Sequence, residues 1–410
     1  MNLTESYKNR LKKLAGLNPD DVKIDVPTDV TSMRDIFLKN GYKLFLVGGA
    51  IRDAILGKTP KDYDLATDAS PKAVIRMLEK QPFVDNILET GKKFGIVNVI
   101  TTDGEEYEIA RFRKDIGSGR RPDEVEFTTI DKDVLRRDLT INALFYDLEK
   151  NKIIDLVGGV DDLKKGIIRT VGDATVRITE DRLRIMRAIR FATLFDSEIE
   201  QKLDLALKQD SRLGGFPVIK NADGTTTTEN ISEERIRDEF LKGIKSAQSV
   251  KNFLELVDKY DLFQWIFPNL KIGKLIEERI PTVLIAHLLK WNDPKKIKST
   301  LLSSRYTKNR SDDPSSSKEI GRILFLIKLT ELNIDNATKL KEEQNRYEVT
   351  PEEITAYAKH NNLDNNLISA FLKYDLSVTS TDFIDQGFQG AALGAAINNK
   401  EREVFKSLLS

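Results

Sequence analysis

The segment 46–64 constrains the fold of this chain most, because it combines a Gly-Gly turn with two closely spaced aspartates. Apolar residues before Gly48 predict a short strand, and a helix is expected to begin directly after Gly49. Such a turn lets the backbone approach a ligand closely, and free amides at a helix N-terminus favour an anion. Asp62 and Asp64 lie two residues apart in a second predicted strand. We therefore expect both carboxylates to leave the same face of that strand.

Two hard oxygen ligands of this kind suit a magnesium ion that also carries a triphosphate. Each part is common by itself, because a Gly-Gly turn is usually only a turn and an isolated Asp-x-Asp is usually a solvated loop. The order and spacing of the two parts together predict a nucleotidyl-transfer site. In it, Asp62 and Asp64 bind metal while Gly48 and Gly49 approach phosphate.

The composition limits the remaining chemistry. A chain of 410 residues with 40% hydrophobic residues predicts two to four packed units. The formal net charge is zero, so any nucleic-acid affinity must come from local basic patches. Cysteine is absent, which removes disulfides, thiolate metal sites and cysteine nucleophiles. His287 and His360 are the only histidines, which excludes a histidine-rich metal site and the His-Asp pair of some multidomain nucleotide hydrolases.

Targeting signals are not evident. The N-terminus is too charged for a signal peptide, and no apolar run reaches the roughly eighteen residues needed to span a bilayer. These features predict a cytoplasmic protein with no membrane partner.

Residues 31–157 alternate between helical and strand patterns and predict an α/β head. Residues 1–30 predict a short helix (Thr4 to Leu17) and a linker. Ser70 and Pro71 are favourable N-cap and first-turn residues. Asp103-Gly104 predicts a hairpin turn. The expected elements of the head are helix 31–40, strand 42–47, helix 50–57, strand 62–67, helix 71–80, and strands at about 83–88, 94–101 and 105–112.

The pattern becomes helical after the head. One excursion at 214–230 predicts a hairpin, because Asp223-Gly224 is followed by a run of threonines.

A first additional cluster contains Arg136, Arg137, Asp138 and Asn142, in a helical context that begins near Asp131 or Asp133. Two arginines followed by an aspartate can grip phosphate while the carboxylate orients a guanidinium or a ribose hydroxyl. An ordinary surface salt-bridge face is the alternative interpretation.

A second cluster lies on a predicted helix capped by Thr179. Asp181 and Arg184 are three residues apart and therefore neighbours on the helix surface. Aspartate only accepts hydrogen bonds and arginine only donates them, so the pair complements the base edge of cytosine or adenine. Guanine and uracil present the reverse order. The pair could thus select C and A without a nucleic-acid template.

Arg187 and Arg190 continue the same helix in steps of three residues, which wind away from Asp181. We expect Arg187 to contact another part of the nucleotide, and the position of Arg190 is less constrained. The alternative is an ordinary amphipathic helix with Leu183, Met186 and Ile189 inward and an arginine-rich solvent face.

A third cluster begins at Glu108 on a predicted strand. This carboxylate could join the metal site, and a salt bridge to Arg111 or Arg113 is an equal alternative. A glycine-rich basic loop over 117–123 could close on nucleotide or RNA.

These segments, in this order, resemble the class II tRNA nucleotidyltransferases, or CCA-adding enzymes, and the related bacterial poly(A) polymerases. The similarity covers roughly residues 40–195. It implies an α+β fold, in which a nucleotidyltransferase head with a palm-like sheet of about five strands precedes an elongated all-α neck, body and tail. The implied divisions are 1–30 (N-terminal helix and linker), 31–157 (catalytic head), 158–245 (neck, base recognition) and 246–410 (body and tail, tRNA binding).

The resemblance also implies residue roles. Gly49 and Arg52 would hold the triphosphate, Asp62 and Asp64 would bind two Mg²⁺ ions, and Asp181 with Arg184 would be the base template. CTP and ATP would be the substrates, and the tRNA acceptor arm would be the partner. The implied catalytic residues are Asp62, Asp64 and Glu108, and the nucleotide-binding residues are Gly48, Gly49, Arg52, Arg137, Asp138, Asn142, Asp181, Arg184, Arg187 and Arg190.

Two departures from the family pattern affect the expected product. Segment 88–98 resembles the Gly-basic-basic-Phe signature of the poly(A) polymerases, but it lacks the apolar pair before the glycine and the histidine after it. This favours the tRNA enzyme. The loop between Arg113 and Arg120 is short and has no tyrosine, which the resemblance associates with enzymes that add only CC.

The expected function is therefore addition of C and A to the 3′ end of tRNA, completing CCA. The alternatives are a CC-adding or A-adding tRNA nucleotidyltransferase, a poly(A) polymerase, or a noncatalytic RNA-binding protein on the same scaffold. The oligomeric state is left open.

Overall fold

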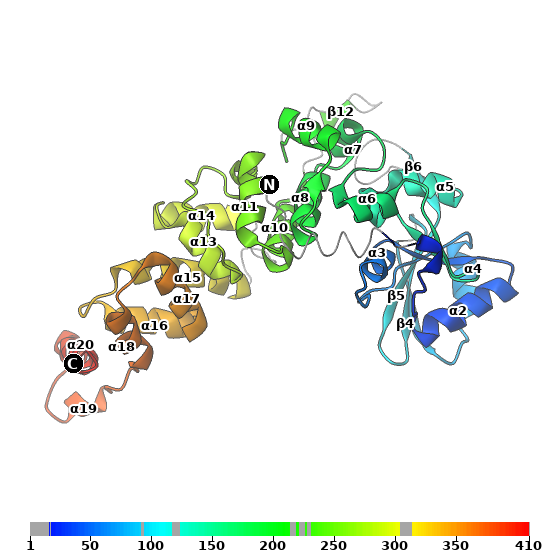
Figure 1. Ribbon diagram of the computed structural model, residues 1–410. Helices are drawn as coiled ribbons and strands as arrows, with labels where there is room; N and C mark the ends of the chain where they lie inside the picture. The colour runs from blue at the N-terminus through cyan, green and yellow to red at the C-terminus, as the bar shows by residue number, and fades with distance from the viewer. Residues whose placement is uncertain are drawn as a thin grey trace. The chain divides into compact units, whose positions relative to one another are not determined.

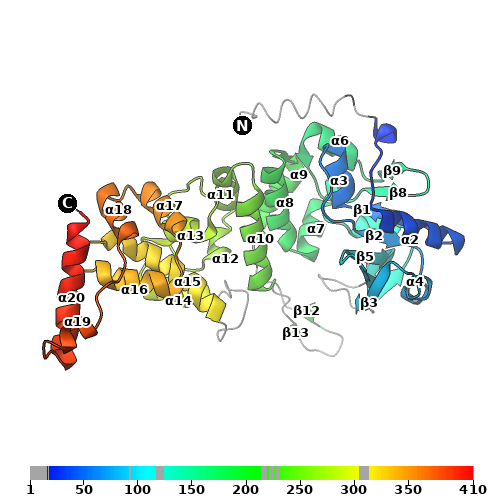
Figure 2. The same ribbon diagram turned by 90° about the horizontal axis from the view of Figure 1, so that it is seen from below.

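The computed structural model describes residues 16, 18–91, 94–116, 124–213, 219–220, 226–227, 231–303 and 314–409 (Figures 1 and 2). The chain forms two compact units, Met1–Ile231 and Ser232–Ser410. The predicted helix from Thr4 to Leu17 lies almost entirely outside the described residues, as does the basic loop 117–123.

The first unit is built on a seven-stranded mixed sheet with the strand order β3-β4-β5-β2-β1-β8-β9. Neighbouring strands are antiparallel, except that β2 and β5 are parallel. The strands are β1 (Leu44–Val47), β2 (Leu65–Thr67), β3 (Val84–Gly91), β4 (Ile96–Thr101), β5 (Glu106–Arg111), β8 (Phe145–Asp147) and β9 (Lys152–Ile154).

Strands β1 to β5 are the five strands predicted from sequence, and the expected hairpin at Asp103-Gly104 joins β4 to β5. The expected number of about five strands is too low, because β8 and β9 extend the sheet beyond β1. All three residues of β8 are buried, so its sequence lacks the alternation that marks a strand with one wet face. A turn with Asn151 at φ 52° joins β8 to β9.

The second predicted strand begins later than expected. Strand β2 starts at Leu65, so Asp62 and Asp64 lie before it and the same-face argument from strand alternation does not apply. The backbone is nevertheless held, because the Val47 amide donates to the Asp64 carbonyl at 3.0 Å.

Helices α2 (Thr28–Lys39) and α4 (Pro71–Leu78) contact the sheet through β1 and β4 and also contact each other. Ser70 caps α4 as predicted, since its Oγ accepts from the Ala73 amide at 3.2 Å. The remaining elements of the head are α3 (Gly49–Ile55), β6 (Arg113–Ile116), β7 (Glu124–Phe127), α5 (Ile130–Asp133), η3 (Val134–Arg136) and η4 (Thr140–Asn142).

The neck helix expected to begin at Thr179 is two helices, α7 (Ala174–Glu180) and α8 (Leu183–Leu194). Asp173 caps α7, whereas Thr179 lies inside it and donates its hydroxyl to the Thr175 carbonyl. The break falls at Asp181, whose φ of −146° and ψ of 103° are extended. The predicted inward face of α8 is confirmed, because Leu183, Met186 and Ile189 are buried.

The first unit also contains α6 (Gly159–Lys165), β10 (Ile167–Ile168), β11 (Glu198–Ile199) and α9 (Gln201–Gln209). Strand β12 (Ile219–Lys220) pairs antiparallel with β13 (Thr226–Thr227), which confirms the hairpin expected within 214–230. The turn residues Asp223 and Gly224 lie outside the described residues.

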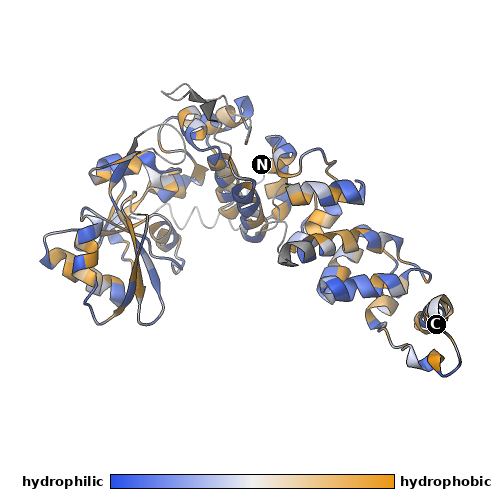
Figure 3. Ribbon diagram, turned by 180° about the vertical axis from the view of Figure 1, so that it is seen from behind, coloured by the Kyte–Doolittle hydropathy of each residue, from blue (hydrophilic) through white to orange (hydrophobic). Residues whose placement is uncertain are grey.

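Every regular element among the described residues of the second unit is a helix. Its central helix is α13 (Pro281–Leu289), which is buried from Thr282 to Leu289 and contacts α15 and α17. Figure 3 shows hydrophobic and hydrophilic residues mixed along the other helices. These helices are α10 (Glu233–Ser246), α11 (Val250–Lys259), α12 (Phe263–Ile266), α14 (Pro294–Ser303), α15 (Pro314–Lys328), η5 (Leu329–Glu331), α16 (Ala337–Tyr347), α17 (Pro351–Asn361), α18 (Asn365–Lys373), α19 (Thr381–Ile384) and α20 (Gly390–Ser407).

None of the helices within the described ranges is both long and apolar enough to cross a bilayer.

Candidate active site

The Gly48-Gly49 turn joins β1 to α3 (Figure 1). Gly48 has a φ of 71°, which side chains disfavour, and its amide donates to the Leu144 carbonyl at 2.9 Å. A Cβ atom at Gly48 would lie 3.4 Å from the Asn142 carbonyl oxygen. No side chain caps α3, so the turn combines a tight backbone with an uncapped helix start.

Arg52 and Asn142 lie together beside this turn. Arg52 Nη1 donates to Asn142 Oδ1 at 2.6 Å, and Arg52 Nε donates to Asp53 Oδ1 at 2.9 Å. The Arg52 guanidinium carbon lies 5.2 and 5.0 Å from the ring centres of Phe191 and Phe195. Within the described residues, the buried Asn142 Nδ2 has no hydrogen-bond partner. The turn is therefore flanked by a fixed cation and a buried donor, which suits phosphate or sugar oxygens.

Asp62 and Asp64 remain exposed in the segment before β2. The surrounding protein nevertheless displaces enough water to raise the pKa of Asp64, and the Asp62 carboxylate raises it further. The Arg137 guanidinium opposes this shift. The two aspartates are therefore close enough to repel each other, as two ligands of one cation would be.

Glu108 joins the same group of charges. Strand β5 pairs with β2 at Ile109 and Leu65, so Glu108 and Asp64 come just before paired positions. Partial burial raises the pKa of Glu108, and the Asp64 charge adds to the shift. The Arg113 charge lowers this pKa. Glu108 thus lies near both an aspartate, as a metal ligand would, and an arginine, as a salt-bridge partner would.

A metal ion would need ligands beyond the protein. Within the described residues, no three carboxylate or histidine side chains are grouped closely enough to form a complete metal site. Magnesium commonly takes one or two protein carboxylates and completes its shell with water and substrate phosphates. The Asp62 and Asp64 carboxylates, which repel each other, fit that type of site.

Arg136 and Arg137 are held by Asp133, whose side chain is 1% exposed. Arg137 Nη2 donates to Asp133 Oδ2 at 3.1 Å, and Arg136 Nε donates to Asp133 Oδ1 at 2.9 Å. The Arg137 guanidinium also lies 4.6 Å from the Phe145 ring centre. Because Asp133 is buried, these ion pairs belong to the interior of the head. The alternative interpretation, an ordinary salt-bridge face on the surface, fits them less well.

Asp138 and Arg187 link the head to α8. Arg187 Nε donates to Asp138 Oδ2 at 2.6 Å. Burial alone would raise the pKa of Asp138, but the Arg187 guanidinium holds it below its usual value. The pair is 49 residues apart in sequence and was not predicted.

Asp181 and Arg184 already have partners inside the protein. The Asp181 carboxylate accepts from the Leu183 amide at 3.1 Å, at the break between α7 and α8. Arg184 Nη1 donates to Glu180 Oε2 at 2.7 Å and to the Arg177 carbonyl at 2.8 Å. Arg184 Nη2 donates to the Arg136 carbonyl at 3.1 Å. A base-reading role would require Arg184 to exchange at least one of these partners.

The Arg190 guanidinium lies 4.2 Å from the Phe191 ring centre. Sequence reasoning missed the Phe191 and Phe195 rings that support Arg52. It also missed the role of Glu180. Phe191 and Phe195 are four residues apart at the end of α8, and this spacing indicates that they share one face. It does not indicate that this face contacts Arg52.

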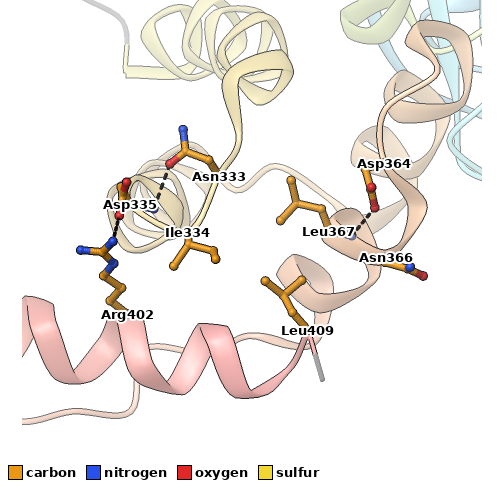
Figure 4. Close-up of a pocket in the computed structure, with 8 residues that line it drawn as sticks. All are labelled: Asn333, Ile334, Asp335, Asp364, Asn366, Leu367, Arg402 and Leu409. Atoms are coloured by element: carbon orange, nitrogen blue, oxygen red, sulfur yellow. Dashed lines mark hydrogen bonds and ion pairs between the residues drawn. The ribbon is translucent and has the colours of Figure 1, made fainter.

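A separate cavity of about 470 Å³ lies in the second unit (Figure 4). Ile334, Leu367 and Leu409 point into it, and Asp335 forms an ion pair with Arg402 at its edge. The lining also includes Asp364, whose Oδ1 accepts from the Leu367 amide at 2.9 Å. Both aspartates of this cavity are therefore already held by partners inside the second unit.

Comparisons with known proteins match two parts of the chain to family models. Residues 44–169 match the poly A polymerase head domain, and residues 218–272 match the domain described as "Probable RNA and SrmB- binding site of polymerase A". The chain is 30% identical to the CCA-adding enzyme of Lactobacillus helveticus, over 93% of this chain and 96% of that one.

Solved structures show the same fold. The Bacillus stearothermophilus CCA-adding enzyme in complex with CTP has a TM-score of 0.65 and 23% identity, with 93% of each chain covered. The Thermotoga maritima CCA-adding enzyme in complex with tRNA has a TM-score of 0.62 and 18% identity, covering 100% of this chain and 99% of that one. The chain belongs to the CCA-adding enzymes, a family of nucleotidyltransferases.

Proposed function

We propose that this enzyme adds C and A to the 3′ end of tRNA from CTP and ATP, completing CCA. The observation that carries the proposal is the charge arrangement of the head. Burial raises the pKa of Asp64 and of Glu108, and the charge of Asp62 adds to the first shift and that of Asp64 to the second, beside a Gly48-Gly49 turn flanked by arginine. Family membership supports it, as do the relatives described with CTP and with tRNA.

Each residue of the head has a defined task in this proposal. Arg52 and the Gly48-Gly49 backbone bind the triphosphate, and Asn142 Nδ2 donates to a nucleotide oxygen. The Arg137 guanidinium offsets part of the negative charge at Asp64, and Asp138 orients Arg187 toward the sugar and phosphates. Tight positioning of this kind supplies much of the rate in phosphoryl and nucleotidyl transfer.

Enzymes of this family use divalent metal ions, and we propose two Mg²⁺ ions held by Asp62 and Asp64, with Glu108 in support. When bound, they would lower the pKa of the attacking hydroxyl and stabilise the leaving pyrophosphate. In the reaction, the 3′ oxygen of the RNA forms a bond to the α-phosphorus of the nucleotide. The bond between that phosphorus and the bridging oxygen breaks, pyrophosphate leaves, and the hydroxyl proton is released.

Base selection is assigned to the neck, residues 158–245. Asp181 would accept from the exocyclic amino group of C or A, and Arg184 would donate to the ring nitrogen beside it. Arg184 must first release Glu180 or the Arg136 carbonyl. Arg187 and Arg190 would complete the pocket, and residues 246–410 would bind tRNA.

The decisive experiment incubates purified protein with tRNA that lacks CCA and with one labelled nucleoside triphosphate at a time. We expect C to be added first and A only after CTP has been supplied. Incorporation of C without A would identify a CC-adding enzyme, and a long tract of A alone would identify a poly(A) polymerase. No incorporation of any nucleotide, with retained tRNA binding, would identify a noncatalytic RNA-binding protein.

A further inference from the structure

An exposed tryptophan lies at the end of α13 in the second unit. The Trp291 side chain is 72% exposed, whereas α13 is buried up to Leu289. Tryptophan contributes a large apolar surface and is rarely left so open unless it contacts a partner.

The indole ring is supported by the protein. Gly273 donates its amide to the Leu288 carbonyl at 2.7 Å, and a Cβ atom at Gly273 would lie 3.5 Å from Trp291 Cδ1. Lys290 Nζ lies 5.0 Å from the ring centre and donates to Asn361 Oδ1 at 2.6 Å. The ring therefore lies beside Gly273 and the Lys290 ammonium, with most of its surface in solvent.

Exposed lysines lie on the segments next to Trp291. The Lys271 amide donates to Asn292 Oδ1 at 2.8 Å, and the Lys271 carbonyl accepts from Asn292 Nδ2 at 2.8 Å, which places Lys271 next to Trp291 in the structure. Helix α14 begins shortly after Trp291 and carries exposed Lys295, Lys296 and Lys298.

In the part of the chain that the structure describes, no acidic side chain forms an ion pair with Lys271, Lys295, Lys296 or Lys298. The nearby Asp293 Oδ1 accepts from the amides of Lys295 and Lys296 at 2.9 and 3.1 Å, so it caps α14. The chain as a whole has no net charge, which makes this local excess of positive charge notable.

We propose that Trp291 and these four lysines form an RNA-binding platform, in which the indole stacks on an exposed base and the lysines contact neighbouring phosphates. The inference rests on the proposed function, which supplies RNA as the substrate. Stacking tolerates any base because every base has a π-face, and lysine contacts to phosphate position RNA without reading sequence. A continuous duplex hides its base faces, so the feature recognised is a loop or the end of a base-paired stack.

The platform can be tested in the full-length protein by replacing the ring. Trp291→Ala should weaken binding of tRNA lacking CCA by about fivefold or more, and Trp291→Phe should retain most of the affinity. The KM for CTP should not change, because the platform contacts RNA. The exposed Lys339→Gln and Lys373→Gln variants are matched controls and should bind tRNA like the wild type.

The chain has two tryptophans, so fluorescence reports on the ring directly. In a Trp265→Phe background, Trp291 emission should be quenched by tRNA and by a short hairpin RNA with an open loop. A long blunt duplex at the same nucleotide concentration has no loop and few ends, so it should quench the emission much less. Equal quenching by all three would overturn the stacking assignment.

Salt dependence tests the lysines. Each lost phosphate contact should reduce the slope of log Kd against log salt by about 0.7 to 0.9, so Lys271→Gln with Lys295→Gln and Lys296→Gln should lower it by roughly 2. If the wild type extends tRNA while the Trp291 and lysine variants bind tRNA normally, the platform is wrong and the proposed function stands. If the wild type adds no nucleotide to tRNA, the proposed function itself fails. Loss of binding to an acidic protein, with unchanged RNA binding, would also overturn the RNA assignment.

Discussion

The metal side and the base side of the candidate site differ in how their charges are balanced. On the proposed metal side, burial raises the pKa of Asp64 and of Glu108, and the charge of Asp62 adds to the first shift and that of Asp64 to the second. By contrast, Arg184 is paired with Glu180 and Arg187 is paired with Asp138 on the proposed base side. A cation would therefore stabilise the metal side, whereas the base side would have to exchange existing bonds for new ones.

This difference suggests a division of labour. Carboxylates on β5 and just before β2 would favour a cation whatever base the nucleotide carries. When a wrong base dissociates, Arg184 can return to its internal partners, Glu180 and the Arg136 carbonyl. Release of a wrong base therefore leaves no unpaired donor on this arginine. Selectivity can then come from whether the incoming base replaces those bonds well.

The largest effect is expected from removing a metal carboxylate. Asp64→Ala should reduce the rate of C addition on the order of a thousandfold or more, because the metal stabilises the transition state more than it binds RNA. Single-turnover rates with tRNA lacking CCA measure this, and a tRNA Kd close to that of the wild type is the control. A rate within tenfold of the wild type would rule out Asp64 as a metal ligand.

A smaller effect is expected at the link between head and neck. Asp138→Ala removes the carboxylate that orients Arg187 and should slow CTP and ATP alike, by roughly ten- to a hundredfold. Sugar and phosphate carry no base information, so the ratio of the two rates should not change. Asp161→Ala, an exposed aspartate on α6, is the matched control. A change confined to one nucleotide would instead assign Asp138 to base recognition.

The base side should respond in selectivity. Asp181→Ala removes the proposed acceptor and should slow addition of C and A. The rate with UTP or GTP, divided by the rate with CTP or ATP, should rise about tenfold. Competition assays with all four nucleotides measure the ratio directly. Full retention of the preference for C and A would move the template elsewhere and leave α8 as a basic structural helix.

The comparison also explains what could be predicted from the sequence. Strands β1 to β5 and the Ser70 cap follow local patterns of alternation and turn residues. Strand β8 was missed because it is buried on both faces. The break at Asp181 was missed because Thr179 predicts the N-cap of one helix, whereas it lies inside α7.

The candidate site shows the same limit. The glycines, aspartates and arginines could be picked out because their chemistry is written in short motifs. Their hydrogen-bond partners could not be predicted, because Arg187 binds Asp138, 49 residues away in sequence, and Arg52 binds Asn142, 90 residues away. Side chains so distant in sequence leave no periodic signal.

The smallest expected effect concerns stability without metal. The pKa of Asp64 is raised in the folded protein, so the folded state holds its proton more tightly than the unfolded state does. The stability contributed by this group is therefore present at low pH, below the unfolded pKa, and is lost as the pH rises through the folded pKa. At pH 7 the ionised Asp64 destabilises the metal-free fold.

Asp64→Asn should consequently raise the Tm of the metal-free protein at pH 7, by on the order of 1 to 3 °C, because solvent screening keeps the repulsion small. Thermal unfolding with and without Mg²⁺ measures this. Magnesium should raise the Tm of the wild type more than that of the variant, since a ligand stabilises the state that binds it. The exposed Glu79→Gln variant should behave like the wild type. A lower Tm for metal-free Asp64→Asn would mean that Asp64 stabilises the fold, and the contrast between a repulsive metal side and a paired base side would not hold.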